Sequence, residues 1–236
     1  MIVLASWDDG SIEDLRIAEL MQKYNIPCIF YWSVFTDIKT KVAVKSTRGK
    51  IKNSKSKVKK EYQEKKVKIA NNFSKIKDFL SEGDRQKIAK DFEVGSHTLY
   101  HNFLTFISEE KAKTEISESK IIFQKKYNQK IDSFCYPRGY YNDSIKNMVK
   151  NAGYKTARAT LIGNTSLPKD NYCITATAHV GIQRVEYEGT PWLQYCFDKL
   201  KEAEKNGYYH IFGHSWEIQK NNAWGDLEIL LKAIKK

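Results

Sequence analysis

His97 and His101 have clear potential for chemistry, because two of the five histidines lie four positions apart within residues 95–101 (GSHTLYH). They follow directly on the short apolar run 92–94. If a strand ends near Ser96 and a helical turn follows, this spacing brings both imidazoles to one side. Neutral imidazoles in that position suit a divalent metal ion. Alone, such a pair is more often surface or packed residues than ligands, so the metal hypothesis needs further ligands.

Asp8 and Asp9 supply such ligands far away in the sequence. They precede Gly10 and follow the apolar run 2–5. Adjacent acids before a glycine can also be simple turn residues, whose carboxylates bond the backbone. Two carboxylates and two imidazoles, however, could form a zinc site with one acid left over.

The elements that would position these residues alternate between strand and helix. Apolar runs predict strands at 2–6, 26–34, 92–96, 131–136, 154–160 and 208–212. Helical spacing predicts helices at 11–24, 58–80, near 85–91, at 108–127 with a Ser108 cap, and at 143–151, 191–205 and 224–234. Repeated alternation implies an α/β fold with a mostly parallel sheet, open or closed as a barrel. Chemistry in such barrels collects at the carboxyl ends of the strands.

Four polar clusters follow four of these predicted strands. They are Asp8 and Asp9, His97, Pro137 with Arg138, and His214. The carboxyl ends of parallel strands meet at one edge of a sheet, so the four clusters can converge on one mouth. This convergence is a stronger signal than any single motif.

Composition limits the class of protein. With 236 residues, of which 41% are hydrophobic, the chain is typical of one soluble globular domain covering 1–236. No stretch approaches the roughly 18 apolar residues of a membrane helix. The first residues do not resemble a signal peptide, so we expect a cytoplasmic location. The four cysteines are widely spread, and we expect them to be reduced.

The net charge of +12 comes almost entirely from a Lys-rich insert at about 39–68, which holds 13 Lys and Arg against two Glu. One interpretation is a solvated loop that leads into an amphipathic helix. The other is a charged flap that binds an anionic ligand. We do not expect nucleic acid as a partner, since Tyr62 is the insert's one aromatic residue.

Four motifs together carry a family resemblance: SWDDGS at 6–11, GSHTLYH at 95–101, FCYPRGYYN at 134–142 and YYHIFGHSWEI at 208–218. In this order they resemble the successive motifs of the polysaccharide deacetylase family, the NodB-like carbohydrate esterases. The resemblance implies a distorted (β/α) barrel, mostly of parallel strands, with a metal-dependent deacetylase site at its mouth. The substrate that it implies is an acetylated carbohydrate.

The resemblance also implies roles for five residues. Asp8 matches the family's catalytic base and His214 its catalytic acid, while Asp9, His97 and His101 match the ligands of one divalent metal ion, for which zinc is favoured. Such a set could attack an amide, which needs an activated water, a charge sink for the carbonyl oxygen and a proton for the leaving amine. His210 lies on the same predicted strand as His214, but His214 stands at the strand end. His179 has no motif around it, and we expect it to be a loop or packing residue.

The third motif departs from the commonest family pattern. Many members place an arginine two residues before the motif's proline, where Cys135 stands here, to orient the catalytic aspartate. Arg138 or Arg158 could supply that cation instead, and either could keep Asp8 ionised. We expect Cys135 to be inert, because no local feature lowers the pKa of its thiol. The family's tryptophan-containing aspartate motif is also hard to find after Gly153, which leaves the residues that support His214 undefined.

Candidate substrate contacts are Tyr136, Pro137 and Trp216, of which the two aromatic residues could form apolar walls for a sugar. Three functions remain open. The first is a zinc-dependent hydrolase that removes acetyl groups from N-acetylated sugars of the N-acetylglucosamine type. The second keeps the site but acts on an O-acetyl ester or a small amide. The third is an inactive barrel whose basic insert binds an anionic polymer.

Overall fold

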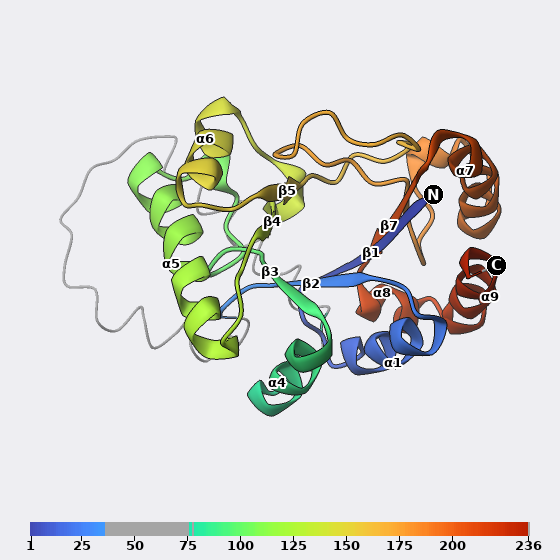
Figure 1. Cartoon of the computed structure of the whole chain (residues 1–236), viewed down its shortest axis with the longest axis horizontal. Helices are drawn as coiled ribbons and strands as arrows, with labels where there is room; N and C mark the ends of the chain where they lie inside the picture. Colours follow the sequence, from blue (N-terminus) through green and yellow to red (C-terminus); the bar gives the residue numbers. More distant parts are fainter. Residues whose placement is uncertain (36–75, 77, 236) are drawn as a thin grey trace, which may run out of the picture.

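The core of the molecule is a parallel β-sheet of seven strands, seen in a computed structural model that describes residues 1–35, 76 and 78–235 (Figure 1). The strand order is β5-β4-β3-β2-β1-β7-β6, and every neighbouring pair is parallel. The strands are β1 (Ile2–Asp8), β2 (Cys28–Trp32), β3 (Glu93–Ser96), β4 (Ser133–Cys135), β5 (Thr156–Arg158), β6 (Ala178–His179) and β7 (Tyr208–Gly213). The prediction of an α/β fold with parallel strands is confirmed.

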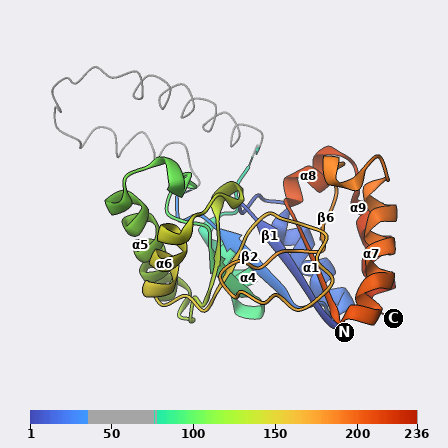
Figure 2. The same cartoon turned by 90° about the horizontal axis from the view of Figure 1, so that it is seen from above.

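Helices cover the outside of this sheet. The α-helices are α1 (Asp14–Tyr24), α4 (Glu82–Asp91), α5 (Glu109–Tyr127), α6 (Asp143–Asn151), α7 (Trp192–Asn206), α8 (Ser215–Lys220) and α9 (Trp224–Ile234), and the 3-10 turns are η1 (Leu104–Phe106), η2 (Pro137–Gly139) and η3 (Val185–Tyr187). Figure 2 shows α5 and α6 on one side of the strands and α7 and α9 on the other. Strands β2 and β7 are buried along their whole lengths, as their continuous apolar sequences require.

The barrel is incomplete between β5 and β6, the two edges of the sheet. Residues 171–177 run across this gap. The Ile174 amide donates to the Ala157 carbonyl at 2.8 Å, and the Thr177 amide donates to the His210 carbonyl at 2.7 Å. The segment thus bonds β5 on one side and β7 on the other, and this irregular closure makes the barrel distorted.

Most predicted elements occur close to their predicted bounds. Helix α6 begins and ends where expected, and Ser108 caps α5 by accepting a hydrogen bond from the Lys111 amide. Helix α1 begins at Asp14 rather than at residue 11, because Ser11 is buried and pairs with Phe79 in a short antiparallel bridge. Two short elements, β6 and α8, were not predicted.

The Lys-rich insert at 39–68 lies outside the described residues, as does most of the helix predicted at 58–80. The end of that helix prediction is wrong, because residues 78–80 are not helical. The Ile12 amide donates to the Asp78 carbonyl at 2.9 Å, and the Leu80 amide donates to the Gly10 carbonyl at 3.0 Å. The segment is extended because it bonds the loop that carries the aspartates. In the described part of the chain, no helix is long and apolar enough to span a membrane.

Candidate active site

The carboxyl ends of the strands meet around a cavity of about 420 Å³. Asp8 ends β1, His97 follows β3, and His214 follows β7. The cavity lining comprises Asp8, Asp9, His97, His101, Arg138, Tyr140, Thr160, His179, Ile182, Arg184, Phe212, His214, Trp216 and Glu217. All residues of three of the four polar clusters found in the sequence therefore line this cavity. Of the fourth cluster, Arg138 lines the cavity and Pro137 does not.

Asp8 and Asp9 are adjacent in sequence, yet both line the cavity. In a continuing strand their side chains would point to opposite faces. The alternation ends because Asp9 and Gly10 both adopt left-handed backbone conformations, with φ of 78° and 75°. The Asp9 amide still donates to the Tyr31 carbonyl, at 3.1 Å, which ties the turn to β2.

His97 and His101 lie together, with ring centroids 4.6 Å apart. The predicted helical turn between them is wrong. Thr98 and His101 have left-handed backbones, with φ of 72° and 54°, and the His101 amide donates to the Thr98 hydroxyl at 2.9 Å. The loop is also held from outside, because the buried Glu115 carboxylate accepts the Leu99 and Tyr100 amides. This folded loop, rather than a helix, brings the two imidazoles together.

Asp9, His97 and His101 form a compact group of possible metal ligands. Asp9 Oδ1 lies 3.5 Å from His101 Nε2 and 3.8 Å from His97 Nε2. Ligand atoms that share a tetrahedral zinc ion at about 2.0–2.1 Å stand roughly 3.3 Å apart. Among the described residues, the buried Asp9 Oδ1 has no hydrogen-bond partner. An unpaired buried carboxylate oxygen is costly, so this group of donors fits a cation.

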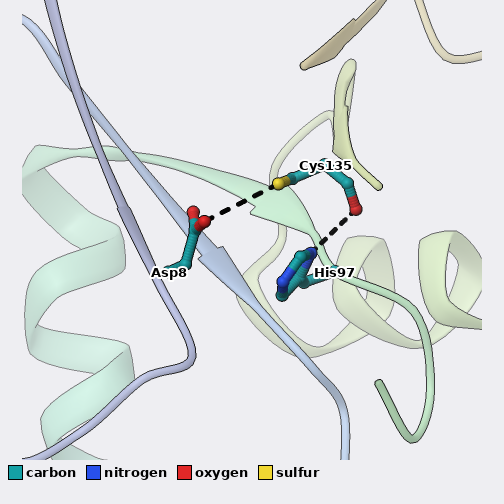
Figure 3. Close-up of side chains that lie close together, drawn as sticks. All are labelled: Asp8, His97 and Cys135. Carbon is teal, nitrogen blue, oxygen red and sulfur yellow. Dashed lines mark hydrogen bonds between the residues drawn. The ribbon is translucent and has the colours of Figure 1, made fainter. Parts of the chain in front are cut away.

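The tautomer of His97 also fits a metal ligand. Its Nδ1 lies 2.8 Å from the Cys135 carbonyl, which can only accept, so Nδ1 carries the proton (Figure 3). Nε2 then carries a free lone pair, 3.8 Å from Asp9 Oδ1. Burial lowers the pKa of His97, which keeps the ring neutral. A backbone carbonyl that fixes the ring in this way is typical support for a metal-binding histidine.

Asp8, His97 and Cys135 form a second compact group at the base of the cavity (Figure 3). The Cys135 thiol contacts Asp8 Oδ2 at 3.8 Å. A cation is already present there, since Arg158 Nη2 lies 2.9 Å from the sulfur and also bonds Asp8. Burial raises the pKa of Cys135 well above its usual value, so the thiol stays protonated. A guanidinium and a protonated thiol make this group a poor metal site.

Arg158, and not Arg138, is the arginine that bonds Asp8. Its Nη2 donates to both carboxylate oxygens, at 2.5 Å for Oδ1. Both side chains are almost completely buried. Burial alone would raise the pKa of Asp8, but Arg158, followed by His97 and His214, lowers it. Asp8 is therefore held as a carboxylate.

Arg138 lies on the cavity wall, where its backbone carbonyl accepts a hydrogen bond from the Thr160 hydroxyl.

His214 faces the two aspartates from the opposite wall. Its Nε2 lies 3.7 Å from Asp9 Oδ2 and 4.0 Å from Asp8 Oδ2, and its Nδ1 donates to Glu217 Oε2 at 2.7 Å. Burial opposes a charge on the ring, but Glu217 and the two aspartates outweigh it and raise the pKa of His214 to about 9. His214 is thus protonated at neutral pH, with Nε2–H available to a group in the cavity.

Comparison with known proteins agrees with this geometry. The family model for polysaccharide deacetylases matches residues 2–157. The chain belongs to the polysaccharide deacetylase family. The match includes Asp8, Asp9, His97 and His101, whereas Arg158 and His214 lie beyond it.

Similarity to one curated protein is limited to part of the chain. A peptidoglycan-N-acetylglucosamine deacetylase of Bacillus cereus is 33% identical over 72 residues, which cover 30% of this chain and 33% of that protein. The chain therefore spans about a third of the length of this curated relative.

Two solved structures share the fold. The Xyl-CE4 domain of a multidomain xylanase, from the hindgut metagenome of Trinervitermes trinervoides, has a TM-score of 0.56 at 14% identity, covering 100% of this chain and 84% of that one. The deacetylase PplD of Streptococcus pyogenes, in complex with acetate, has a TM-score of 0.52 at 17% identity, covering 73% of this chain and 62% of that one. These likenesses support the distorted barrel expected of a polysaccharide deacetylase.

The three predicted substrate contacts occupy different places in this polysaccharide deacetylase fold. Trp216 lines the cavity beside His214, with ring centroids 5.8 Å apart. Tyr136 is buried instead, where it stacks on Tyr141 and donates its hydroxyl to the Tyr172 carbonyl. Pro137 is buried as well. Among the described residues, only Trp216 of the three lines the cavity.

His179 and Glu217 are among the cavity residues that were not identified as functional from the sequence. His179 is buried and packs on Phe212, as expected of a packing residue, but it also lines the cavity and contacts Glu217 Oε2 at 3.0 Å. Glu217 follows His214 by three positions at the start of α8, and residues so spaced face each other on a helix. That spacing could have revealed Glu217 from the sequence. His179 lies on a two-residue strand with no recognisable pattern.

Proposed function

We propose that this protein is a zinc-dependent hydrolase that removes acetyl groups from N-acetylated sugars of the N-acetylglucosamine type. One observation carries the proposal. A group of candidate metal ligands with an unpaired buried carboxylate oxygen lies beside an ionised aspartate, Asp8, and a protonated histidine, His214. Base, acid and metal ligands thus share one cavity.

Asp9, His97 and His101 would hold the ion. When bound there, zinc would supply a more acidic water molecule and polarise the acetyl carbonyl. With three protein ligands, the site keeps a position for that water. The Cys135 carbonyl holds the His97 ring in the tautomer that leaves Nε2 free for the ion.

Asp8 would act as the general base. Arg158 keeps the carboxylate ionised and fixes its direction, so Asp8 can take a proton from the water that attacks the acetyl carbon. Pairing with a buried guanidinium weakens a base. It also guarantees that the carboxylate is in the correct protonation state at neutral pH.

His214 would act as the general acid. An amine is a poor leaving group, and cleavage of the amide C–N bond requires a proton on nitrogen. His214 carries that proton at neutral pH, because the pKa of its ring is raised to about 9. After the C–N bond breaks, the products are acetate and a free amino sugar.

Two observations support an N-acetylglucosamine-type sugar. The Bacillus cereus relative is named for N-acetylglucosamine in peptidoglycan, and it matches only part of this chain. Trp216 and Tyr140 line the cavity and offer apolar faces, against which the C–H face of a sugar ring can pack.

The proposal is tested by measuring bound zinc and acetate release on the same preparations. The wild-type protein should bind about one zinc ion per chain and release acetate from N-acetylglucosamine oligomers. Asp8→Asn should keep the zinc and lose the activity, whereas His101→Ala should lose both. Full activity in both variants, or zinc-loaded wild-type protein without amide hydrolysis, would refute the proposed function.

A further inference from the structure

His179, the last residue of β6, is buried and held in one orientation by several contacts. Its ring stacks on Phe212, with centroids 4.4 Å apart and ring planes inclined by 20°. Its backbone amide donates to the Tyr187 hydroxyl at 3.0 Å, and that hydroxyl donates in return to the His179 carbonyl. The backbone and the ring are therefore both fixed at the wall of the cavity.

Arg184 determines the tautomer of His179. Its Nη1 lies 3.1 Å from His179 Nδ1, and a guanidinium can only donate, so Nδ1 must be the acceptor. The rest of the guanidinium bonds Glu186, which holds it in place. The proton of the neutral His179 ring is consequently on Nε2, and burial lowers the pKa of this ring to about 4.

Glu217 receives hydrogen bonds from two imidazoles at a single oxygen. His179 Nε2 lies 3.0 Å from Oε2, and His214 Nδ1 lies 2.7 Å from the same atom. Arg184, His179, Glu217 and His214 thus form one chain of hydrogen bonds, in which His179 fixes the carboxylate that orients His214. The two rings also touch edge to face, with centroids 5.3 Å apart.

We propose that His179 is a positioning residue for the proton donor His214, acting through Glu217 with its tautomer set by Arg184. This inference rests on the proposed function, in which His214 protonates the leaving nitrogen. Without the Nε2–H of His179, the Glu217 carboxylate is free to rotate, and the His214 ring loses its fixed direction toward the substrate nitrogen.

The same three residues, His179, His214 and Glu217, could be taken for a second metal site, since their ligand atoms lie within 4.8 Å of one another. The contact with Arg184 argues against this. It makes His179 Nε2 a donor, and it places a guanidinium next to the group. The chemistry fits a relay of hydrogen bonds better than a cation site.

The test compares two substrates with different leaving groups. N-Acetylglucosamine oligomers release an amine that must be protonated, whereas p-nitrophenyl acetate releases a stable anion that needs no proton. Loss of His214 positioning therefore lowers amide hydrolysis selectively. The ratio of the two rates does not depend on the fraction of protein that is folded, so it separates positioning from stability.

His179→Leu should lower the amide-to-ester ratio by roughly ten- to a hundredfold, by analogy with the loss of partners that orient metal-binding histidines. His214→Ala sets the largest change to be expected. His210→Leu is the matched control, because His210 is another buried, neutral histidine, on β7, that bonds Ser6 and does not line the cavity. It should lower the melting temperature similarly and leave the ratio unchanged.

A second pair of variants keeps the test decisive if His179→Leu does not fold. The amide nitrogen of His179→Gln can reach the place of Nε2 and donate to Glu217, whereas that of His179→Asn matches Nδ1. His179→Gln should retain a clearly higher ratio than His179→Asn.

Equal ratios in wild type, His179→Leu and His179→Asn would overturn the proposal, as would an equal fall in His210→Leu. Two zinc ions per chain, falling to one in His179→Leu, would show a metal site instead and also overturn it. Failure of the proposed function is distinguishable, because it would already appear as absent amide hydrolysis in the wild-type protein.

Discussion

Arg158 at the end of β5 bonds both carboxylate oxygens of Asp8 at the end of β1, although 150 residues separate them. Three strands, β2, β3 and β4, lie between them in the sheet. The guanidinium crosses the interior of the barrel, where it packs over the Phe212 ring at 4.3 Å. The curvature of the sheet makes this ion pair possible, since a flat sheet would hold the two strand ends apart.

Replacing Arg158 by Gln should raise the pKa of Asp8, because the largest opposing influence on a buried carboxylate is removed. An NMR titration of the Asp8 carboxyl carbon measures the change directly. Arg138→Gln is the control, since Arg138 lines the cavity without bonding Asp8, and it should leave the titration much closer to wild type. The same Asp8 titration in wild type and Arg158→Gln would contradict this assignment.

The same Arg158→Gln variant should be less stable by about 3–5 kcal/mol at neutral pH, as expected when one partner of a buried ion pair is removed. The pKa of Asp8 is lower in the folded state than its ordinary 3.8. The pair's contribution is therefore complete above pH 3.8 and is lost as the pH falls through the folded value. Urea unfolding at neutral and acidic pH should show a smaller difference between variant and wild type at the lower pH.

The sequence was sufficient to predict the residues that end regular strands. Asp8, His97 and His214 all follow apolar runs, and the parallel sheet necessarily brings such positions to one edge. The conformation of the loops could not be predicted from the sequence. His101 approaches Asp9 through left-handed backbone at two non-glycine residues and through bonds to the distant Glu115, and neither has a local signal.

The choice between Arg138 and Arg158 could not be made from the sequence either. Arg138 follows one predicted strand and Arg158 lies near the end of another. The outcome depends on the curvature of the sheet and on the small Cys135 side chain, whose sulfur lies 2.9 Å from the Arg158 guanidinium. The residues that hold His214 in place were not predicted, for a related reason. It comes partly from β6, a two-residue edge strand too short to produce any periodic pattern.

Zinc should stabilise the folded protein, because it would pair the buried Asp9 Oδ1 that has no hydrogen-bond partner among the described residues. At a free zinc concentration about a hundredfold above the dissociation constant, the expected gain is about 2.7 kcal/mol. Calorimetric melting of chelator-treated protein, with and without added zinc, measures it. His101→Ala should show little or no rise, and a rise equal to that of wild type would place the ion elsewhere.

The Cys135 thiol should be dispensable for the chemistry. Its pKa is raised well above the usual value by burial, so it is a poor nucleophile, and its role is to fill the space beside Arg158. Cys135→Ser should keep bound zinc and most amide hydrolysis, because a hydroxyl also accepts from the guanidinium. Cys135→Leu, which is too large for this space, should disturb the pair of Asp8 and Arg158 and lose activity. Abolished activity in Cys135→Ser with zinc still bound would instead assign the sulfur a chemical role.

Amide hydrolysis should decline as the pH rises through about 9, because His214 then loses the proton that it donates. The Glu217 carboxylate is the largest influence that raises this pKa, so Glu217→Gln should move the decline toward neutral pH. The contribution of the His214–Glu217 pair to the stability of the folded protein also decreases as the pH rises. It is complete below the ordinary pKa of 6.5 and is lost as the pH rises through about 9. Profiles of kcat/KM against pH for N-acetylglucosamine oligomers check the shift. Asp198→Asn is the control, since Asp198 is an exposed acid on α7 that accepts a hydrogen bond from Gln194 and does not bond His214. A decline at the same pH in Glu217→Gln and wild type would mean that another group sets the alkaline limit.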